Sequence, residues 1–311
     1  MSRAVGLHLG LLAALAAAQF LLPEYHHGNL ARIMVLAAFA SAYNITFGYA
    51  GMLSLGHAMF FGAGLYAAGL AAEFGGTAAP LGLGLGVLAG AIVATVVGLL
   101  ALRTTGVSFM IVTLMFAQAG FLTVLYFGEF TRGDEGFVLS PAARTVLGVS
   151  LAEPAMRYWA ALGVFGAVML GSLWLARSAF GRVLAAIREN EERTRMLGYD
   201  VFRAKLMALA VSGAMAGAAG AAYALLFGYV GATFASIQYS ILPLLWVLMG
   251  GAATVLGPFL GTLLMFYLID ISSGFTTAHM MIVGFALIGL ILFFPKGILG
   301  TLRERLAPWL P

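Results

Sequence analysis

Residues 80–102 read PLGLGLGVLAGAIVATVVGLLAL, a run of 23 residues without a charged side chain. About 20 predominantly apolar residues are enough for a helix to cross the hydrocarbon core of a bilayer. Within the run, Gly82, Gly86 and Gly90 recur at every fourth position, and small residues at that spacing let two helix backbones approach closely. The stretch therefore predicts a membrane-spanning helix that packs tightly against a neighbouring helix.

The composition of the whole chain supports a membrane protein. Of 311 residues, 62% are hydrophobic and 9% are charged, and the mean hydropathy is +1.01. A soluble chain of this length needs a charged shell that 16 Lys and Arg and 12 Asp and Glu cannot supply. Cysteine is absent, which excludes a disulfide framework, a thiolate metal site and a cysteine nucleophile.

Apolar stretches recur along the chain. We mark ten of them, at residues 5–22, 30–47, 52–72, 80–102, 107–127, 156–176, 205–228, 240–256, 257–275 and 279–294. The eighth and ninth are short and share the Gly257-Pro258 junction, so they predict either two tilted helices or one helix and a re-entrant segment. We therefore expect an all-α polytopic membrane protein of about ten spans (eight to ten), forming a single transmembrane domain over residues 1–311.

The first stretch has features of a cleavable signal peptide. Arg3 precedes the apolar run, and Ala16-Ala17-Ala18 lie near its end. Because many further spans follow, we interpret this stretch as a retained first helix.

Positive charges are divided unevenly between the loops. If the N-terminus is cytoplasmic and ten spans alternate, 12 of the 16 Lys and Arg lie on the cytoplasmic side. These are Arg3, Arg103, the seven bases from Arg177 to Lys205, Lys296, Arg303 and Arg305; the outer four are Arg32, Arg132, Arg144 and Arg157. The positive-inside rule predicts this split for an inner-membrane protein with both termini in the cytoplasm. The net charge of +4 thus follows from topology and indicates no nucleic-acid partner.

Five stretches precede the outer loop of residues 128–155 and five follow it. An odd-numbered half, if duplicated, is inverted across the membrane. A similar glycine-bounded pattern occurs at residues 51–56 (GMLSLG) and at residues 251–257 (GAATVLG). Glycine-broken apolar segments in matching halves are typical of a midplane transport pathway, so the sequence suggests an inverted five-span repeat.

Polar side chains lie at membrane depth in residues 44–62, between glycines that can break a helix. Such groups are costly in lipid, so they should face protein, water or solute. Broken helix ends also expose backbone donors and acceptors that suit a zwitterionic or amide solute. One interpretation is a substrate pathway; the other is bonding between neighbouring helices. The candidate pathway residues are Asn44, Thr46, Gly51, Ser54, Gly56 and His57.

Two titratable residues stand out within the apolar stretches. His57 has no carboxylate or histidine near it in sequence, which favours a helix–helix hydrogen bond over a proton relay. Asp270 is the one carboxylate well inside a predicted span, without a second such group beside it. An ion-coupled secondary transporter using Asp270 and His57 remains the alternative function.

Residues 177–204 form a long and strongly charged loop. Residues 183–197 consist of helix-forming residues and end at Gly198, a good C-cap. We therefore predict one helix over residues 183–197, with Gly198 at positive φ. Ala186, Ile187, Met196 and Leu197 are apolar positions on this otherwise charged helix, a pattern suited either to docking another protein or to a solvated connector.

Four motifs in order resemble one family. Residues 48–58 (GYAGMLSLGHA) are similar to the signature of the ABC importer permeases for branched-chain amino acids, and to the longer of their two permease subunits. Residues 187–191 (IRENE) with 197–200 (LGYD) resemble that family's cytoplasmic coupling loop. Residues 250–258 (GGAATVLGP) and 295–299 (PKGIL) match its late motifs.

The resemblance implies a set of partners. They are a second permease subunit in a heterodimer, two ATPase subunits that hold the ATP, an extracytoplasmic solute-binding protein and the membrane lipid. It also implies that the loop inserts into a cleft of an ATPase subunit, with candidate coupling residues Arg188, Glu189, Asn190, Glu192, Arg195 and Gly198. No cofactor or metal is expected on this chain.

Two departures leave the solute open. The family often has Ser-x-Glu before the eighth span, where this chain reads Ser236-Ile237-Gln238, and residues 132–136 (RGDEG) are more charged than is usual. The resemblance implies branched-chain amino acids or a similar small polar solute such as urea, an amide or an aromatic acid.

Other functional classes fit the sequence less well. The chain has no Gly-x-x-x-x-Gly-Lys-Ser/Thr loop, so a separate subunit would have to bind ATP. It also has no His-Glu-x-x-His or Gly-x-Ser-x-Gly motif and no other catalytic constellation, so we expect a transport subunit and not an enzyme.

Overall fold

The computed structural model describes residues 3–146 and 148–305, which are almost entirely helical. In chain order the elements are α1 (Arg3–Leu21), α2 (Glu24–Asn44), the π-helix η1 (Ile45–Tyr49), α3 (His57–Gly75), α4 (Ala79–Ala101), α5 (Gly106–Tyr126), α6 (Gly128–Thr131), β1 (Phe137–Val138), η2 (Pro141–Arg144), β2 (Thr145–Val146), β3 (Val149–Ser150), α7 (Pro154–Arg177), α8 (Ala179–Glu189), α9 (Glu191–Met196), α10 (Val201–Phe227), β4 (Tyr229–Val230), η3 (Ala232–Ala235), α11 (Ile237–Gly250), α12 (Gly257–Ser273), α13 (His279–Phe293) and α14 (Gly297–Arg305).

Each of the ten predicted apolar stretches contains a helix, which confirms a polytopic helical membrane protein. In the described residues, seven helices are long and apolar enough to cross a membrane: α1, α2 with η1, α3, α4, α5, α7 and α10. Shorter apolar helices occupy the last three stretches. Two separate helices, α11 and α12, form there and pack against each other, and Gly257-Pro258 begins the second.

The glycines at every fourth position form close helix contacts. Gly86 and Gly90 of α4 face Gly213 and Gly217 of α10, and a Cβ added at any of the four would overlap backbone or a side chain across the contact. This confirms the packing that the spacing predicted, because only small residues permit such an approach.

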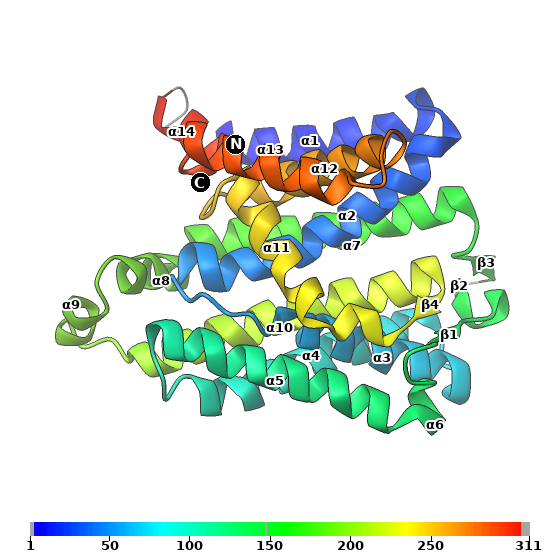
Figure 1. Cartoon of the computed structure of the whole chain (residues 1–311), viewed down its shortest axis with the longest axis horizontal. Helices are drawn as coiled ribbons and strands as arrows, with labels where there is room; N and C mark the ends of the chain where they lie inside the picture. The colour runs from blue at the N-terminus through cyan, green and yellow to red at the C-terminus, as the bar shows by residue number, and fades with distance from the viewer. Residues whose placement is uncertain (1–2, 147, 306–311) are drawn as a thin grey trace.

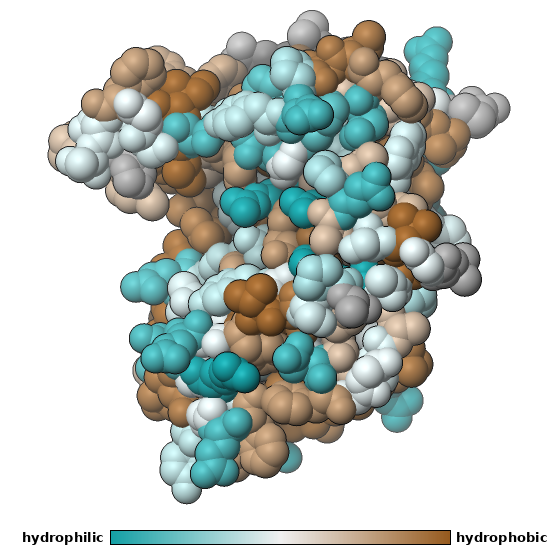
Figure 2. Space-filling view, turned by 90° about the vertical axis from the view of Figure 1, so that its right-hand side faces the viewer, coloured by the Kyte–Doolittle hydropathy of each residue, from teal (hydrophilic) through white to brown (hydrophobic). Residues whose placement is uncertain are grey.

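Figure 1 shows most of the helices running side by side, so the bundle has two ends. At one end lie α8, α9 and α14. At the other end lie α6 and two short antiparallel ladders, β1 with β4 and β2 with β3. Figure 2 views the molecule from this second end, where hydrophilic residues are spread among apolar ones. The base-rich loop and the loop of residues 128–153 thus lie at opposite ends.

The helix α2 is the centre of the bundle. In the most apolar part of α2 and η1, 89% of the residues are buried. The helix packs against α7, α10, α11 and α12. At its end the α-helix widens into the π-helix η1, and residues 51–56 follow without helical structure. Gly51 has φ +69°, a conformation that residues with a Cβ rarely adopt. Figure 1 shows this segment turning back into the bundle before α3 begins at His57.

Packing partners recur with a five-span offset. The second-span helix α2 packs on α11 and α12, and the seventh-span helix α10 packs on α3 and α4. A similar motif follows each of these helices, at residues 48–51 (GYAG) and at residues 228–231 (GYVG). Its last glycine lies six residues before the start of α3 in the first case and of α11 in the second. This offset agrees with the inverted five-span repeat that the sequence suggests.

The particular pair of segments suggested by the sequence was wrong. Residues 51–56 connect α2 to α3, and residues 251–256 connect α11 to α12, at the same end of the bundle (Figure 1). Inverted equivalents must lie at opposite ends. Under the five-span offset, residues 51–56 correspond instead to residues 231–236, which follow β4.

The prediction of one helix over residues 183–197 was also wrong. The chain forms α8 and α9, with a break at Asn190, which has φ −158° and ψ 103°. Asn190 is the N-cap of α9, since its Oδ1 accepts a hydrogen bond from the Arg193 N–H at 2.8 Å. Glu191 and Glu192 then occupy the first turn, where the helix dipole favours acidic residues. Gly198 has φ +89° just after α9, as predicted.

Candidate functional site

His57 lies at the centre of a buried polar chain. Its Nε2 is 2.9 Å from Ser212 Oγ on α10 and 3.2 Å from Thr46 Oγ1 on η1. Ser212 in turn donates to the Ala42 carbonyl at 2.6 Å, and Thr46 donates to the Tyr43 carbonyl at 2.9 Å. The group therefore bonds α2, η1, α3 and α10 together. The Nδ1 of His57 is buried without a hydrogen-bond partner.

Asn44 connects the two broken segments of the bundle. Its Nδ2 donates to the Thr254 carbonyl at 2.9 Å, and its Oδ1 accepts from the Ala253 N–H at 3.0 Å. Because both the nitrogen and the oxygen of its side-chain amide are used, Asn44, the last residue of α2, fixes the backbone of the link between α11 and α12. Ala253 has φ +56°, a conformation that is costly for a residue with a Cβ.

Ser54 and Gly56 shape the start of α3. Ser54 is fully buried, and its Oγ accepts a hydrogen bond from the Gly56 N–H at 3.2 Å. The neighbouring Leu55 N–H donates to Thr113 Oγ1 of α5 at 3.1 Å. A Cβ at Gly56 would lie 3.0 Å from the Thr113 carbonyl oxygen. The segment before α3 is therefore held in place by α5, with little room for a larger residue.

Arg188 joins the charged loop to the broken helix. Its Nη1 donates to the Gly48 carbonyl at 2.6 Å, and a Cβ at Gly51 would lie 2.9 Å from Arg188 Cγ. Arg303 of α14 makes a parallel contact, since its Nη1 donates to the Ala253 carbonyl at 3.1 Å. Two arginines from the base-rich end therefore hold the two links that Asn44 also connects.

Three cavities open around these arginines. They have volumes of about 490, 510 and 480 Å³, and Arg188 lines all three. Gly51 and Met52 line the first, and Arg303 lines the other two. Of the predicted pathway residues, Gly51 borders a cavity, whereas the Asn44, Thr46, Ser54 and His57 side chains are buried and bonded within the protein.

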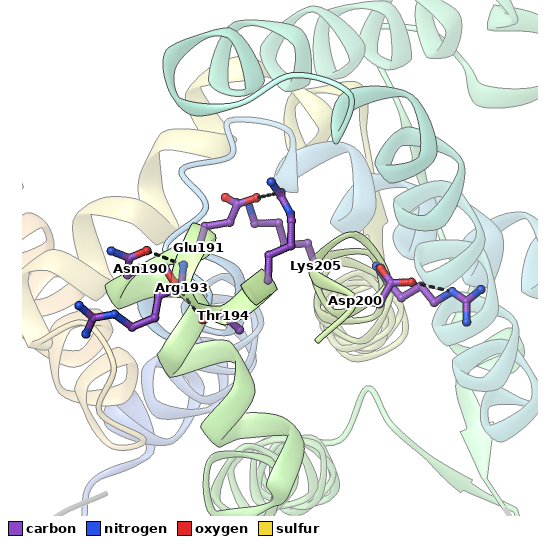
Figure 3. Close-up of polar contacts among 8 residues, drawn as sticks. Asn190, Glu191, Arg193, Thr194, Asp200 and Lys205 are labelled. Carbon is purple, nitrogen blue, oxygen red and sulfur yellow. Dashed lines mark hydrogen bonds and ion pairs between the residues drawn. The ribbon is translucent and has the colours of Figure 1, made fainter. Parts of the chain in front are cut away.

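The loop of α8 and α9 has a buried face and an exposed tip. Leu184 and Ile187 are buried against the bundle, and Glu191 bonds Lys205 of α10 (Figure 3). At the tip, Met196 and Leu197 are 83% and 71% exposed. The predicted coupling residues Glu189, Asn190, Glu192 and Arg195 are exposed as well. The tip therefore presents apolar and charged side chains without a covering element among the described residues.

Asp270 belongs to a different group from His57. Its Oδ2 accepts a hydrogen bond from the Tyr25 hydroxyl at 2.7 Å, and it lines a cavity of about 290 Å³ with Trp246 and Tyr239. No hydrogen bond between described residues connects this group to the polar chain of His57.

Sequence reasoning missed several residues of the site. Ser212, Thr113 and Arg303 are partners of predicted residues but lie far from them in the chain, so no local pattern could have indicated them. Thr254 was within reach, because it follows the glycine pair at residues 250–251 in a motif that was already noted. Asn190 before two glutamates is an N-cap pattern that also could have been recognised.

Long apolar helices, a broken buried helix and small-residue packing are features of a multi-pass helical membrane protein. The family model described as "branched-chain amino acid transport system / permease component" matches residues 27–294. The chain belongs to this family, which confirms the resemblance found in its motifs.

Individual relatives agree with the family. The chain is 27% identical to the high-affinity branched-chain amino acid transport system permease protein LivM of Salmonella typhimurium, over 85% of this chain and 67% of that protein. The LivM protein of Escherichia coli is 26% identical over the same shares. The autoinducer 2 import system permease protein LsrC of Klebsiella pneumoniae is 31% identical over 51% of this chain and 47% of that protein. No solved structure matches the chain.

Proposed function

We propose that the chain is the membrane-spanning permease subunit of a binding-protein-dependent ABC importer in the bacterial inner membrane. It lies there with both termini and the α8–α9 loop in the cytoplasm. The observation that carries the proposal is the Arg188–Gly48 contact, which joins an exposed loop directly to a broken, buried helix. Arg188 thus links α8 directly to the backbone of that helix.

The partners follow from this assignment. A second permease subunit completes the pathway, two ATPase subunits bind the ATP, and a solute-binding protein delivers solute to the outer face. The exposed Met196 and Leu197 at the tip of the loop suit an apolar contact with an ATPase subunit. ATP-driven closure of the ATPase pair then moves α8, and the permease pair opens inward by alternating access.

The solute is a branched-chain amino acid or a similar small polar molecule. The similarity to LivM, a branched-chain amino acid permease, supports an amino acid, whereas LsrC, an autoinducer 2 permease, is a relative with a different solute. The pathway passes beside the segment of residues 44–57. Because Asn44, Thr46, Ser54 and His57 already bond within the protein, their role is to hold this segment, while Gly51 and Gly56 keep it free of side chains.

The test is reconstitution of the complex in liposomes with the second permease subunit, the ATPase subunits and the binding protein. We expect ATP hydrolysis that rises when loaded binding protein is added, and solute uptake that requires ATP. Failure of the chain to associate with any ATPase subunit would contradict the proposal. The alternative, an ion-coupled carrier using Asp270 and His57, would instead show uptake by the chain alone under an ion gradient.

A further inference from the structure

Three arginines converge at the end of the bundle opposite α8. The guanidinium carbons of Arg32 on α2 and Arg157 on α7 lie 5.3 and 5.8 Å from the centroid of the same Phe227 ring. The guanidinium of Arg144, from η2, lies over the next residue, Gly228, where an added Cβ would overlap it. Three of the four bases assigned to the outer side thus gather around the end of α10.

These arginines have no carboxylate partner among the described residues. None of the four ion pairs in that part of the chain includes them. Arg144 is 8% exposed, and the Nε atoms of Arg144 and Arg157 are buried without a hydrogen-bond partner. Arg157 Nη2 donates to a neutral acceptor, the Ala152 carbonyl, at 2.7 Å. Burial and the positive charge of Arg157 lower the pKa of Arg144. Arg144 is thus buried, whereas Arg157 is half-buried and Arg32 is exposed. A buried cation with a second cation nearby is costly unless an anion joins it.

The other end of the bundle shows how such an arginine is satisfied. Gly228 occupies in the second half the position of Gly48 in the first. Arg188 lies at Gly48 and donates to its carbonyl. The Gly228 carbonyl accepts a hydrogen bond from the Leu139 N–H at 2.8 Å, and the described residues show no hydrogen bond from Arg144 to it. The Arg144 guanidinium therefore lacks the acceptor that Arg188 has, and a bound anion would supply one.

We propose that Arg32, Arg144 and Arg157 form a binding site for the carboxylate of a small solute at the outer end of the bundle. Guanidinium groups match a carboxylate through paired, charge-assisted hydrogen bonds. A small solute reaches the nearly buried Arg144 more readily than an acidic side chain on the surface of a docked protein does. That the bound solute is the transported one rests on the proposed function.

The surroundings of the site define the rest of the ligand. Beyond Phe227, ring centroids follow at 4.7 Å to Tyr223, 4.8 Å from there to Phe234 and 5.1 Å on to Tyr239. This row of rings suits an apolar or aromatic body attached to the carboxylate. The site therefore selects organic acids and amino acids over urea and neutral amides.

The probe pair is isovalerate and isovaleramide, which have nearly the same shape and differ in charge. Binding to the purified full-length chain in phosphatidylcholine nanodiscs is measured by titration calorimetry, with the melting temperature as a second readout. We expect isovalerate to bind and isovaleramide not to. Arg144→Met and Arg157→Gln should each weaken isovalerate binding roughly tenfold or more, the effect of losing one charge-assisted hydrogen bond. Arg132→Gln is the control, because it removes an exposed charge from the same outer loop.

Several outcomes would overturn the site. They are no isovalerate binding by the native chain, equal binding by all variants, or stabilisation by phosphatidylglycerol nanodiscs in place of isovalerate, which would make it a lipid site. Without ligand, Arg144→Met should melt at or above the melting temperature of the native chain, since a buried unpaired charge is removed. A clear drop would show that Arg144 already has an acceptor within the chain, which would also overturn the proposal. No ATPase is present, so the result is independent of the importer assignment.

Discussion

Arg188 Nη1 lies 2.6 Å from the carbonyl oxygen of Gly48, although 140 residues separate them in the chain. The donor belongs to an exposed loop and the acceptor to the end of a buried helix that widens into a π-helix. A charged donor on a backbone carbonyl contributes about 1.5–3 kcal/mol, enough to make the two elements move together.

Replacing Arg188 should uncouple ATP hydrolysis from transport. We expect Arg188→Met to lower solute uptake per ATP hydrolysed roughly tenfold, the factor that corresponds to about 1.4 kcal/mol, while the protein still assembles. Uptake and ATPase activity of the reconstituted complex measure this ratio. Arg182→Met is the control, because Arg182 lies on the same helix and bonds only the nearby Arg177 carbonyl. An unchanged ratio for Arg188→Met would mean that the contact plays no part in coupling.

The loop end depends on the conformation of Gly198. Its φ is +89°, and no atom lies within 4 Å of an added Cβ, so backbone strain is the one obstacle to a side chain. We expect Gly198→Val to reduce substrate-stimulated ATP hydrolysis several-fold, since a β-branched residue resists positive φ. Gly198→Asn should retain most of the activity because Asn tolerates this region. Equal activity of the two variants would show that the loop end need not be fixed.

Packing between α4 and α10 should fail at one glycine and tolerate change at its neighbour. A Cβ at Gly86 would meet Ala221, Gly64 and Gly217, whereas Gly84 has nothing within 4 Å. We therefore expect Gly86→Leu to yield little monodisperse protein in size-exclusion chromatography, and Gly84→Leu to behave like the native chain. The same loss in both variants would indicate an effect of hydrophobicity and not of helix contact.

Topology can be read with single cysteines, since the chain has none. We expect an impermeant thiol reagent added to intact cells to label Asp134→Cys and to spare Met196→Cys, which is labelled only after the membrane is opened. Both positions are exposed, Met196 by 83%, so access to the side chain does not limit the reaction. Labelling of position 196 from outside would reverse the orientation.

His57 should matter for stability and not for energy coupling. Ser212→Ala removes its partner on α10, and hydrogen bonds between membrane helices contribute up to about 1–2 kcal/mol. We expect a lower melting temperature for Ser212→Ala, with uptake that still requires ATP and survives a protonophore. If the protonophore abolished uptake while ATP remained available, His57 or Asp270 would regain a role in ion coupling.

The sequence predicted what depends on local pattern. Apolar length located the ten helices, the spacing of Gly82, Gly86 and Gly90 predicted the tight helix, and Gly198 predicted the positive φ. What it missed depends on residues that meet only in the folded chain. Ser212 lies 155 residues from His57, and Arg303 reaches Ala253 from another helix. The three outer arginines were counted as topology signals, because nothing in the linear chain indicates that they converge.

Helices of the first half pack against helices of the second half, and this has a consequence for biosynthesis. A ribosome completes α2 long before it reaches α10, α11 and α12, the helices that bury much of it. Until then, Asn44 lacks the backbone groups of Ala253 and Thr254, and His57 lacks Ser212. The newly inserted first half therefore holds unpaired polar groups within the bilayer. These groups need water, the translocon or a chaperone as a partner until the second half is inserted.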